Sequence, residues 1–400
     1  MTSRLVPDVR RIAVLRANAL GDYIFALPAL ESLHAAYPAA ELVLLGAPWH
    51  AAALTGRPGP VDRVLVAPAR RGIRDAEPDD PVPAADLDGF LDRARAERFD
   101  LALQLHGGGR NSNPIVAGLG ARVTAGLRAE DAPPLDRTVP YVYFQPEVFR
   151  YLEVVGLVGA EPVTYRSRFA IGDADRAEAD RVAPRGPAPR AVVHPGARDP
   201  RRRWPADRFA VVCRALASEG MDVVVTGTAS ERDVIEAVCA SADHPAVRPL
   251  PGRLSVGGLA AFLAAASLVV SNDTGPLHLA AAVGTPAVGM FWIVNMINGA
   301  VPDRGRYRPL ISWTTHCPRC GTDCTGGLFP HRGGPPPCDH PDSFLVDIPV
   351  TEVLAEVRAL LGAAEAGPPG GGAQAGPPGG RAEAGTTCTA RPTCGRSPTA

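Results

Sequence analysis

Three short polar segments of this sequence carry residues suited to chemistry, and each follows a predicted buried strand. They are 16–22 (Arg-Ala-Asn-Ala-Leu-Gly-Asp), 194–205 (His-Pro-Gly-Ala-Arg-Asp-Pro-Arg-Arg-Arg-Trp-Pro) and 271–278 (Ser-Asn-Asp-Thr-Gly-Pro-Leu-His). In open parallel sheets, ligands bind outside the carboxyl ends of the strands. The sequence therefore predicts that all three segments face a ligand cleft.

Asp22 is the candidate proton acceptor of the first segment. A carboxylate here would take a proton from an attacking hydroxyl within hydrogen-bond reach. The structural alternative is that the helix macrodipole favours an acid in the first turn. The segment lacks the Gly-x-Gly-x-x-Gly pattern, which disfavours a nicotinamide or flavin site.

The other two segments suit an anion such as a diphosphate. Arg198 and Arg201–Arg203 stand near a predicted helix start, and guanidinium groups bind phosphate oxygens bidentately. The alternative for each arginine is a solvated surface. In the third segment Pro276 lacks an amide donor, so anion binding would depend on side chains such as Thr274 and His278. The alternative there is N-capping by Asp273 or Thr274, with His278 in the core.

A fourth group combines cysteine and histidine. It reads His316-Cys317-x-x-Cys320-x-x-x-Cys324 and is followed by His331, Cys338 and His340. A structural zinc site on Cys317, Cys320, Cys324 and Cys338, a pair of disulfides, and free thiols are three open interpretations. None of them places this group in the chemical step.

The elements that must position these residues alternate between strand and helix. In the first half, strands are predicted over 11–15, 41–45, 61–66 and 100–105, and helices over 21–37, 84–98 and 145–158. In the second half, strands are predicted over 191–194, 222–226, 268–272 and 287–292, and helices over 206–218, 230–240, 255–266 and 274–283. This alternation predicts an α/β protein with two Rossmann-like units facing across a cleft.

The predicted boundaries follow from composition. We expect an N-terminal domain over 1–165 and a C-terminal domain over 166–363, which includes the Cys-rich segment 316–340. A Pro- and Gly-rich break over 184–189 precedes the second alternation. Residues 364–400, with repeated Ala-Gly-Pro-Pro-Gly, are predicted to be disordered.

All 41 basic residues are arginine, and this composition excludes several enzyme classes. Without lysine there is no Schiff-base lysine for pyridoxal phosphate or aldolase chemistry, and no Walker-type phosphate loop. The net charge of −1 gives no electrostatic reason to expect nucleic acid. No secretion signal is visible, and Gly284-Thr285-Pro286 interrupts the uncharged stretch 274–302. We therefore expect a cytoplasmic protein with at most peripheral membrane association.

In their order along the chain, these motifs resemble glycosyltransferase family 9, the ADP-heptose:lipopolysaccharide heptosyltransferases and their relatives. The resemblance covers about residues 11–300. It rests on Arg16-x-x-x-Leu20-Gly21-Asp22 with Leu27-Pro28-Ala29-Leu30, on His194-Pro195-Gly196 with Arg203-Trp204-Pro205, and on Asp273-Thr274-Gly275-Pro276-x-His278-x-Ala280-Ala281. It implies a GT-B fold, an inverting mechanism without a catalytic metal, and a donor held by the C-terminal domain.

By this resemblance Asp22 matches the family's general base, and ADP-heptose is the favoured donor. The residues expected at the donor are His194, Gly196, Arg198, Arg202, Glu231, Asp273, Thr274, Gly275 and His278. Arg202 stands where the family commonly has lysine, which keeps the charge but changes the geometry.

The acceptor is a glycan or a small molecule, and Asn18, His106, Arg110 and Asn111 are expected on its side. The loop 105–113 departs from the family pattern, which leaves the acceptor open. Two other functions remain: a non-catalytic nucleotide-sugar-binding protein, and another GT-B enzyme such as a nucleotide-sugar epimerase.

Overall fold

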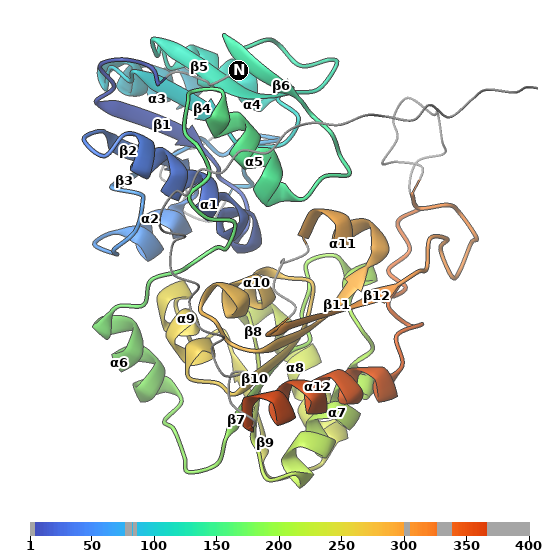
Figure 1. Cartoon of the computed structure of the whole chain (residues 1–400). Coiled ribbons are helices and arrows are strands. Elements are labelled where there is room, and N and C mark those ends of the chain that lie inside the picture. The colour runs from blue at the N-terminus through green and yellow to red at the C-terminus, as the bar shows by residue number, and fades with distance from the viewer. Residues whose placement is uncertain (1–4, 77–81, 83–85, 300–304, 326–337, 366–400) are drawn as a thin grey trace, which may run out of the picture.

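The computed structural model contains two six-stranded parallel sheets, which follow one another along the chain (Figure 1). It describes residues 5–76, 82, 86–299, 305–325 and 338–365. The α/β class and the two Rossmann-like units predicted from the sequence are confirmed. The predicted tail lies outside the described residues from position 366 onward.

The first sheet has the strand order β3-β2-β1-β4-β5-β6. Its strands are β1 (Arg11–Leu15), β2 (Glu41–Gly46), β3 (Arg63–Val66), β4 (Leu101–Gln104), β5 (Val123–Arg128) and β6 (Arg137–Pro140). Its helices are α1 (Leu20–Ala36), α2 (Pro48–Leu54), α3 (Leu87–Ala96), α4 (Ser112–Gly118) and α5 (Glu147–Gly156). The strand order reverses between β1 and β4, so the turn that leads from β1 into α1 and Asp22 leaves the sheet at its ligand-binding switch point.

The second sheet repeats this order as β12-β11-β10-β7-β8-β9. Its strands are β7 (Arg190–His194), β8 (Asp222–Gly227), β9 (Val247–Pro251), β10 (Leu268–Asn272), β11 (Ala287–Trp292) and β12 (Tyr307–Ser312). Its α-helices are α6 (Asp173–Val182), α7 (Ala206–Ser218), α8 (Arg232–Ala242), α9 (Val256–Ala264), α10 (Gly275–Ala282), α11 (Ile293–Gly299) and α12 (Val350–Glu365), with short 3-10 turns over Pro200–Arg202 and Ala229–Glu231. Here the switch point lies between β7 and β10, where His194 pairs with Ser271 in register.

Alternation along the strands sends side chains to both faces of each sheet, as expected for buried parallel strands. In β1, Ile12 and Val14 pack with α1 and α5, whereas Ala13 and Leu15 pack with α3 and α4. In β7, Val192 joins the same core cluster as α9 and α10, while its neighbours Ala191 and Val193 pack with α7, α8 and α12. One apolar cluster therefore runs from the first unit into the second.

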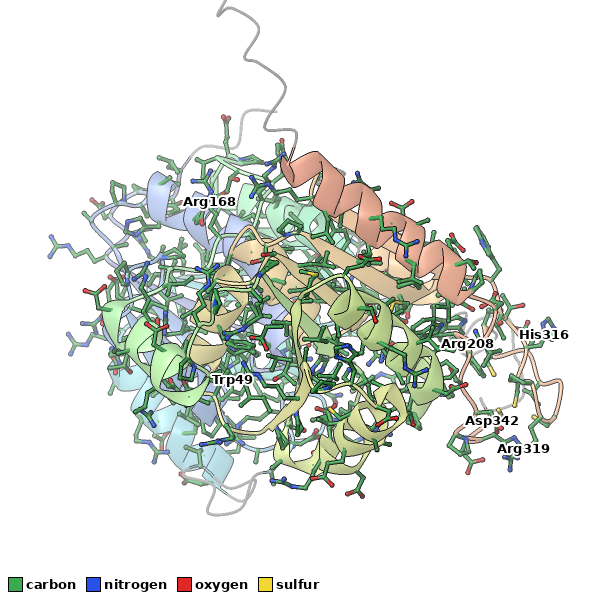
Figure 2. The ribbon with its side chains drawn as sticks, turned by 90° about the horizontal axis from the view of Figure 1, so that it is seen from below. Trp49, Arg168, Arg208, His316, Arg319 and Asp342 are labelled. Atoms are coloured by element: carbon green, nitrogen blue, oxygen red, sulfur yellow. The ribbon has the colours of Figure 1, made fainter. Side chains whose placement is uncertain are left out.

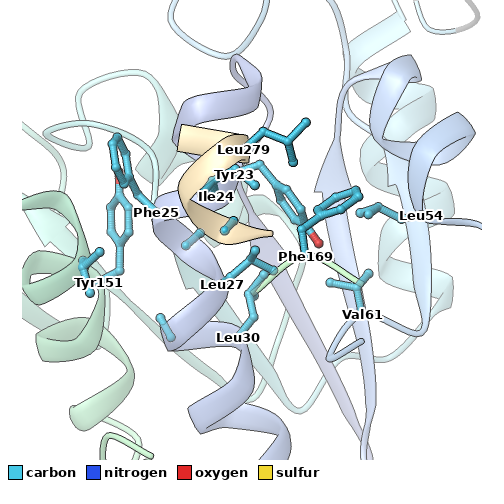
Figure 3. Close-up of a cluster of buried hydrophobic side chains, with 14 of the residues drawn as sticks. Tyr23, Ile24, Phe25, Leu27, Leu30, Leu54, Val61, Tyr151, Phe169 and Leu279 are labelled. Carbon is cyan, nitrogen blue, oxygen red and sulfur yellow. The ribbon is translucent and has the colours of Figure 1, made fainter. Parts of the chain in front are cut away.

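The two units meet where helix α1 packs against helix α10 (Figure 3). Leu279 of α10 lies beside Tyr23 and Ile24 of α1. At the helix starts a Cβ on Gly275 would come within 2.9 Å of the Leu20 Cβ, and a Cβ on Gly21 would lie 3.0 Å from the His278 ring. Glycine at these two positions therefore permits the close approach of the two backbones.

The predicted elements are found, and the structure adds strands that the sequence did not reveal. The bounds of β1, α7, β10 and β11 agree with the prediction. Strands β5, β6, β9 and β12 were not predicted, nor were α2, α4, α6, α11 and α12. Three of the missed strands are sheet edges that contain proline, which edge strands tolerate because one side needs no amide donor.

The stretch 274–302, which resembles a membrane span in composition, forms α10, β11 and α11 over its described part. Among the residues that the structure describes, no helix has both the length and the apolar character needed to cross a bilayer.

A buried histidine of the first unit makes its stability depend on pH. His50 of α2 is stacked on Trp49 with ring centroids 3.6 Å apart, and its Nδ1 accepts the Ala47 amide at 2.9 Å. Burial, together with the charge of Arg16, lowers the pKa of His50 to about 3. The folded protein therefore keeps this imidazole neutral, while the unfolded chain takes up a proton below its ordinary pKa of about 6.5.

We expect the free energy of unfolding to fall as the pH drops from about 6.5 toward 3, because the unfolded state binds the extra proton. His50 should contribute up to about 1.4 kcal/mol per pH unit in this window. Urea unfolding of the wild type and His50→Gln at pH 7, 6 and 5 measures the slope, which should be shallower in the variant. Exposed His34 supplies the control, because His34→Gln should leave the slope unchanged. Equal slopes in wild type and His50→Gln would contradict the assignment.

Candidate active site in the cleft between the two units

A cavity of about 840 Å³ lies between the two units and is lined by all three polar segments. The predicted site residues that line it are Asp22 from the first unit and His194, Arg198, Arg202, Glu231, Asp273, Thr274, Gly275 and His278 from the second. The structure thus brings these predicted residues together in one cleft. Gly196 lies beneath the cavity wall, since a Cβ on it would come within 2.0 Å of the Glu231 carboxylate.

Asp22 is held at the cleft wall by a buried arginine. Its Oδ1 lies 2.8 Å from the Arg16 Nη2, and its Oδ2 accepts the Ala19 amide at 3.3 Å. The Arg16 side chain is 4% exposed, whereas that of Asp22 is 33% exposed. Asp22 therefore combines the helix-capping position expected of a first-turn acid with access to the cavity.

A second carboxylate, Glu147 at the start of α5, lines the same cavity. Its Oε2 lies 3.8 Å from the Arg16 Nη2, so one guanidinium group stands between Glu147 and Asp22. Burial raises the pKa of Glu147, although the Arg16 and Arg150 guanidinium groups favour its ionised form. Sequence reasoning missed this residue, because its only signal is a place in the first turn of the helix predicted over 145–158.

The four arginines of the segment 198–203 divide into two roles. Arg198 and Arg202 line the cavity. Arg201 instead pairs with Asp199 at 2.7 Å, and the Arg203 Nε donates to the Ala197 carbonyl at 2.7 Å. The solvated-surface alternative therefore does not hold for Arg201 and Arg203, whose side chains fix the loop. It does describe Arg198, whose side chain is 82% exposed and pairs with Asp75. Arg253, which the sequence did not indicate, adds a third guanidinium group to the cavity lining.

The Asp273 carboxylate contacts three neighbouring side chains that carry hydrogen-bond donors. Its Oδ1 lies 2.9 Å from the His278 Nε2, and its Oδ2 accepts the Asn295 amide at 2.9 Å. The Arg202 Nη1 also reaches this second oxygen at 3.5 Å. Burial acts to raise the pKa of Asp273, but the hydrogen bond and charge of His278, with Arg202 and Asn295, hold it below its ordinary value. The ionised carboxylate thus directs three donors at the cavity edge.

The start of helix α10 forms the floor of the cavity. Thr274, Gly275 and Pro276 line it, and Pro276 occupies the first turn as expected. The Thr274 hydroxyl donates to the Asn272 carbonyl at 3.2 Å. Asn272 itself ties this turn to the arginine segment, because its side chain accepts the Trp204 amide at 2.9 Å and donates to the Pro195 carbonyl at 2.8 Å.

On the far wall, Glu231 and His194 lie close together at the ends of β7 and β8. The Glu231 Oε2 accepts the Thr228 amide at 2.8 Å and the Thr228 hydroxyl at 2.9 Å, as in a capping box. The His194 Nδ1 lies 3.0 Å from the Thr226 carbonyl. Burial lowers the pKa of His194 despite the charge of Glu231, which keeps the imidazole neutral at physiological pH.

The four residues expected on the acceptor side are not among those that line this cavity. His106 is buried, with its Nδ1 3.4 Å from the Ala17 amide, and burial with the charge of Arg16 lowers its pKa to about 3. The carbonyl of Asn18 accepts the Trp49 indole N–H at 3.2 Å. Arg110 is exposed and pairs with Asp131, and exposed Asn111 follows it. Their part in acceptor binding stays a prediction.

The described cysteines of the Cys-rich segment are not among the residues that line the cleft. Cys317, Cys320 and Cys338 lie together, and the fourth member of their group is His340. Cys324 is not in this group, although it packs in the same apolar core cluster as Cys317, and His331 lies outside the described residues. All six cysteines in the described part of the chain are free.

Comparison with known proteins agrees with this geometry. The family model of glycosyltransferase family 9 (heptosyltransferase) matches residues 90–298. The chain is 28% identical over 178 residues to lipopolysaccharide heptosyltransferase 3 of Escherichia coli, a match that covers 44% of this chain and 48% of that protein. It is 27% identical over 295 residues to lipopolysaccharide heptosyltransferase 1 of Pseudomonas aeruginosa, covering 71% of this chain and 79% of that protein. The first of these alignments thus spans about half the length of its relative.

The fold is also similar to that of a solved structure. The solved structure of E. coli ADP-heptose lps heptosyltransferase II superposes with a TM-score of 0.68 at 19% sequence identity. The superposition covers 89% of this chain and 99% of that structure. The expected GT-B arrangement of two Rossmann-like units is therefore confirmed.

The contacts of Arg16 with Asp22 and Glu147 allow a test of how much the stability of the protein depends on one buried cation. We expect Arg16→Met to lower the free energy of unfolding by about 3–5 kcal/mol, because it leaves two carboxylates near each other and the Leu105 carbonyl without its donor. Urea unfolding at pH 7 measures the loss. The matched control is Arg110→Met, whose ion pair is exposed and should change stability by less than about 1 kcal/mol. Similar losses in both variants would refute the bridging role.

Proposed function

We propose a function from the premise that this chain belongs to glycosyltransferase family 9, the heptosyltransferase family: it transfers a heptose from ADP-heptose to a hydroxyl group of a cell-surface glycan. The observation that carries the proposal is that Asp22 of the first unit lines the same cavity as Arg202, Asp273 and His278 of the second. The named relatives act on lipopolysaccharide, and one structural neighbour is named for ADP-heptose. We propose the acceptor of this chain from its similarity to these relatives.

The proposed reaction uses residues from both walls of the cleft. The acceptor oxygen attacks the anomeric carbon from the face opposite the diphosphate, so the configuration inverts. Its proton passes to the Asp22 carboxylate, and the bond from the anomeric carbon to the phosphate oxygen breaks with its electron pair leaving on ADP. Asp22 suits the base role because its carboxyl group is partly exposed at the cavity and lies beside Arg16.

The diphosphate would lie along the wall that carries Arg198, Arg202 and the start of α10. Guanidinium groups and helix N-terminal amides are suited to the charge that grows on the departing phosphate. Asp273 would act through Arg202 and His278, because both of its oxygens already accept protein donors. We propose that transfer needs no catalytic metal, with these cations serving at the leaving group.

Asp22→Asn tests the base. We expect kcat for heptose transfer to fall by about 10²–10⁴-fold, because the amide cannot take the proton, while the Kd for ADP changes little. The assay uses ADP-heptose with a lipopolysaccharide core oligosaccharide, and calorimetry gives the Kd. Asp88→Asn is the matched control, since Asp88 also stands in the first turn of a helix of this unit but does not line the cleft. Full activity in Asp22→Asn would exclude Asp22 as the base.

Binding of nucleotide sugars without turnover of any acceptor would instead favour a non-catalytic nucleotide-sugar-binding protein. Conversion of the donor sugar to its epimer would favour an epimerase. The same assay separates these outcomes by following the fate of the labelled sugar.

Arg202→Gln tests the donor wall. We expect the Kd for ADP to rise by about 10- to 100-fold, since a charge-assisted hydrogen bond to a phosphate is worth about 1.5–3 kcal/mol. Arg232→Gln is the control, because Arg232 is exposed and pairs with Glu236 instead of lining the cavity. Thermal unfolding with ADP-heptose, a GDP-sugar and a UDP-sugar ranks the donors, and the ADP-linked sugar should give the largest increase in Tm. No stabilisation by any of the three would contradict the proposed donor class.

A further inference from the structure

We propose that Cys317, Cys320, Cys338 and His340 bind one tetrahedral divalent metal ion, with zinc favoured, and that this centre supports the loop that carries Arg202. One ligand atom from each of the four residues lies within 4.8 Å of the others. In a tetrahedral site with metal–sulfur bonds near 2.3 Å, neighbouring sulfurs lie about 3.8 Å apart, so small rotamer changes would complete the geometry. The ligand set differs from the four cysteines expected from the sequence, because His340 takes the place of Cys324.

The first two proposed ligands, Cys317 and Cys320, lie on a tight turn. Gly321 follows Cys320 with a φ of +70°, a conformation that side chains disfavour. The Gly321 amide donates to the Cys317 carbonyl at 2.9 Å, and the Cys317 amide donates to the Thr322 carbonyl at 2.9 Å. An antiparallel bridge between His316 and Asp323 closes the base of the turn. The turn thereby holds the Cys317 and Cys320 thiols near one another.

The other two ligands come from a separate segment that is fixed beside this turn. The Cys317 Sγ lies 3.6 Å from the His340 Nδ1. Arg319, inside the turn, contacts both carboxylate oxygens of Asp342, at 2.9 and 3.1 Å. Figure 2 shows Arg319, Asp342 and His316 together on the outlying lobe of the second unit. The ion pair brings the two ligand segments together independently of any metal.

The chemistry and spacing of the four ligand atoms favour some metals over others. They also bear on the disulfide interpretation that the sequence left open. Three thiolates and one imidazole suit zinc or iron in tetrahedral coordination, and the hard cations Ca²⁺ and Mg²⁺ prefer oxygen. A disulfide needs sulfurs about 2.05 Å apart, whereas the Cys324 and Cys338 sulfurs are 3.9 Å apart. Cys324 is buried in the same apolar cluster as Cys317, but it is not one of the four residues whose ligand atoms all lie within 4.8 Å of one another.

The site is connected to the cleft through the backbone on both sides of Arg202. The Arg201 Nη1 donates to the carbonyl of the ligand Cys338 at 3.3 Å, and the Phe344 amide donates to the Arg201 carbonyl at 2.8 Å. On the other side of Arg202, the Ser343 hydroxyl donates to the Arg203 carbonyl at 2.5 Å. Metal binding would hold residues 338–344 in place and thereby restrict the loop that carries Arg202. This second part rests on the proposed nucleotide site.

Metal content of the purified full-length chain tests the site. We expect about one equivalent of zinc or iron per chain by elemental analysis, and the element found identifies the metal. Cys320→Ser and His340→Gln should each lose most of it, whereas Cys324→Ser should retain it. Less than about 0.2 equivalents in the wild type, or equal loss in Cys324→Ser and His340→Gln, would overturn the proposed ligand set.

Cobalt substitution keeps the test valid if a variant folds poorly. The wild-type chain, stripped with a chelator and titrated with Co²⁺, should show the thiolate charge-transfer and visible bands of tetrahedral cobalt, saturating at one equivalent. Spectra of octahedral cobalt would overturn the site.

Calorimetry with ADP separates the metal site from its link to the cleft. The stripped protein should bind ADP several-fold more weakly than the zinc-loaded protein, and added Zn²⁺ should restore the affinity. Unchanged ADP affinity in a protein that binds metal would overturn the supporting role and leave the metal site intact. Failure of the zinc-loaded protein to bind ADP would refute the proposed function, and the supporting role with it, again without touching the metal result.

Discussion

The close contact between the starts of helices α1 and α10 sets the geometry of the whole cleft. Gly21 and Gly275 let two backbones from different units approach to side-chain distances. Asp22 follows one glycine, and Asp273 and Thr274 precede the other. Any larger residue at either position would separate the carboxylate of the first unit from the anion-binding turn of the second. The apolar cluster shared by α1, α9 and α10 stabilises this arrangement from behind.

Around that contact, the protein keeps its buried charges paired by short, directional interactions. Arg16 connects Asp22 with Glu147 and also donates to the Leu105 carbonyl at 2.8 Å. Asp273 uses both oxygens on His278 and Asn295. A buried charge without such partners would be strongly destabilising, so each network is fixed before any ligand binds. Asp22, Arg198 and Arg202 line the cavity, and the largely exposed Arg198 also pairs with Asp75.

The sequence predicted the elements that are defined by a local residue pattern. It missed those that depend on contacts with distant parts of the chain. Central strands such as β1 and β10 are short apolar runs bounded by turns, so the sequence predicted their ends correctly. Edge strands β6, β9 and β12 contain proline, which reads as a break unless the neighbouring strand is known. Gly126 weakens the pattern of β5, yet a Cβ there would come within 2.7 Å of the Gln104 Cβ.

The same division applies to the site. Asp22, Arg202 and Asp273 follow predicted strands directly, so position along the chain predicted that they face the cleft. Glu147 reaches the cavity from a helix more than a hundred residues after Asp22, and only the three-dimensional packing brings it there. Cys324 and His340 could not be ranked as ligands from spacing, because the fold decides which of the two faces Cys317.

The permanent cations that line the cleft are all guanidinium groups, and this has a regulatory consequence. Acetylation, which silences many phosphate sites by neutralising lysine, has no amine side chain to act on in this chain. Nor does alkaline solution discharge the wall formed by Arg198, Arg202 and Arg253, because arginine keeps its proton throughout the range in which proteins function. The charge of these three guanidinium groups is therefore insensitive both to lysine acetylation and to pH across that range.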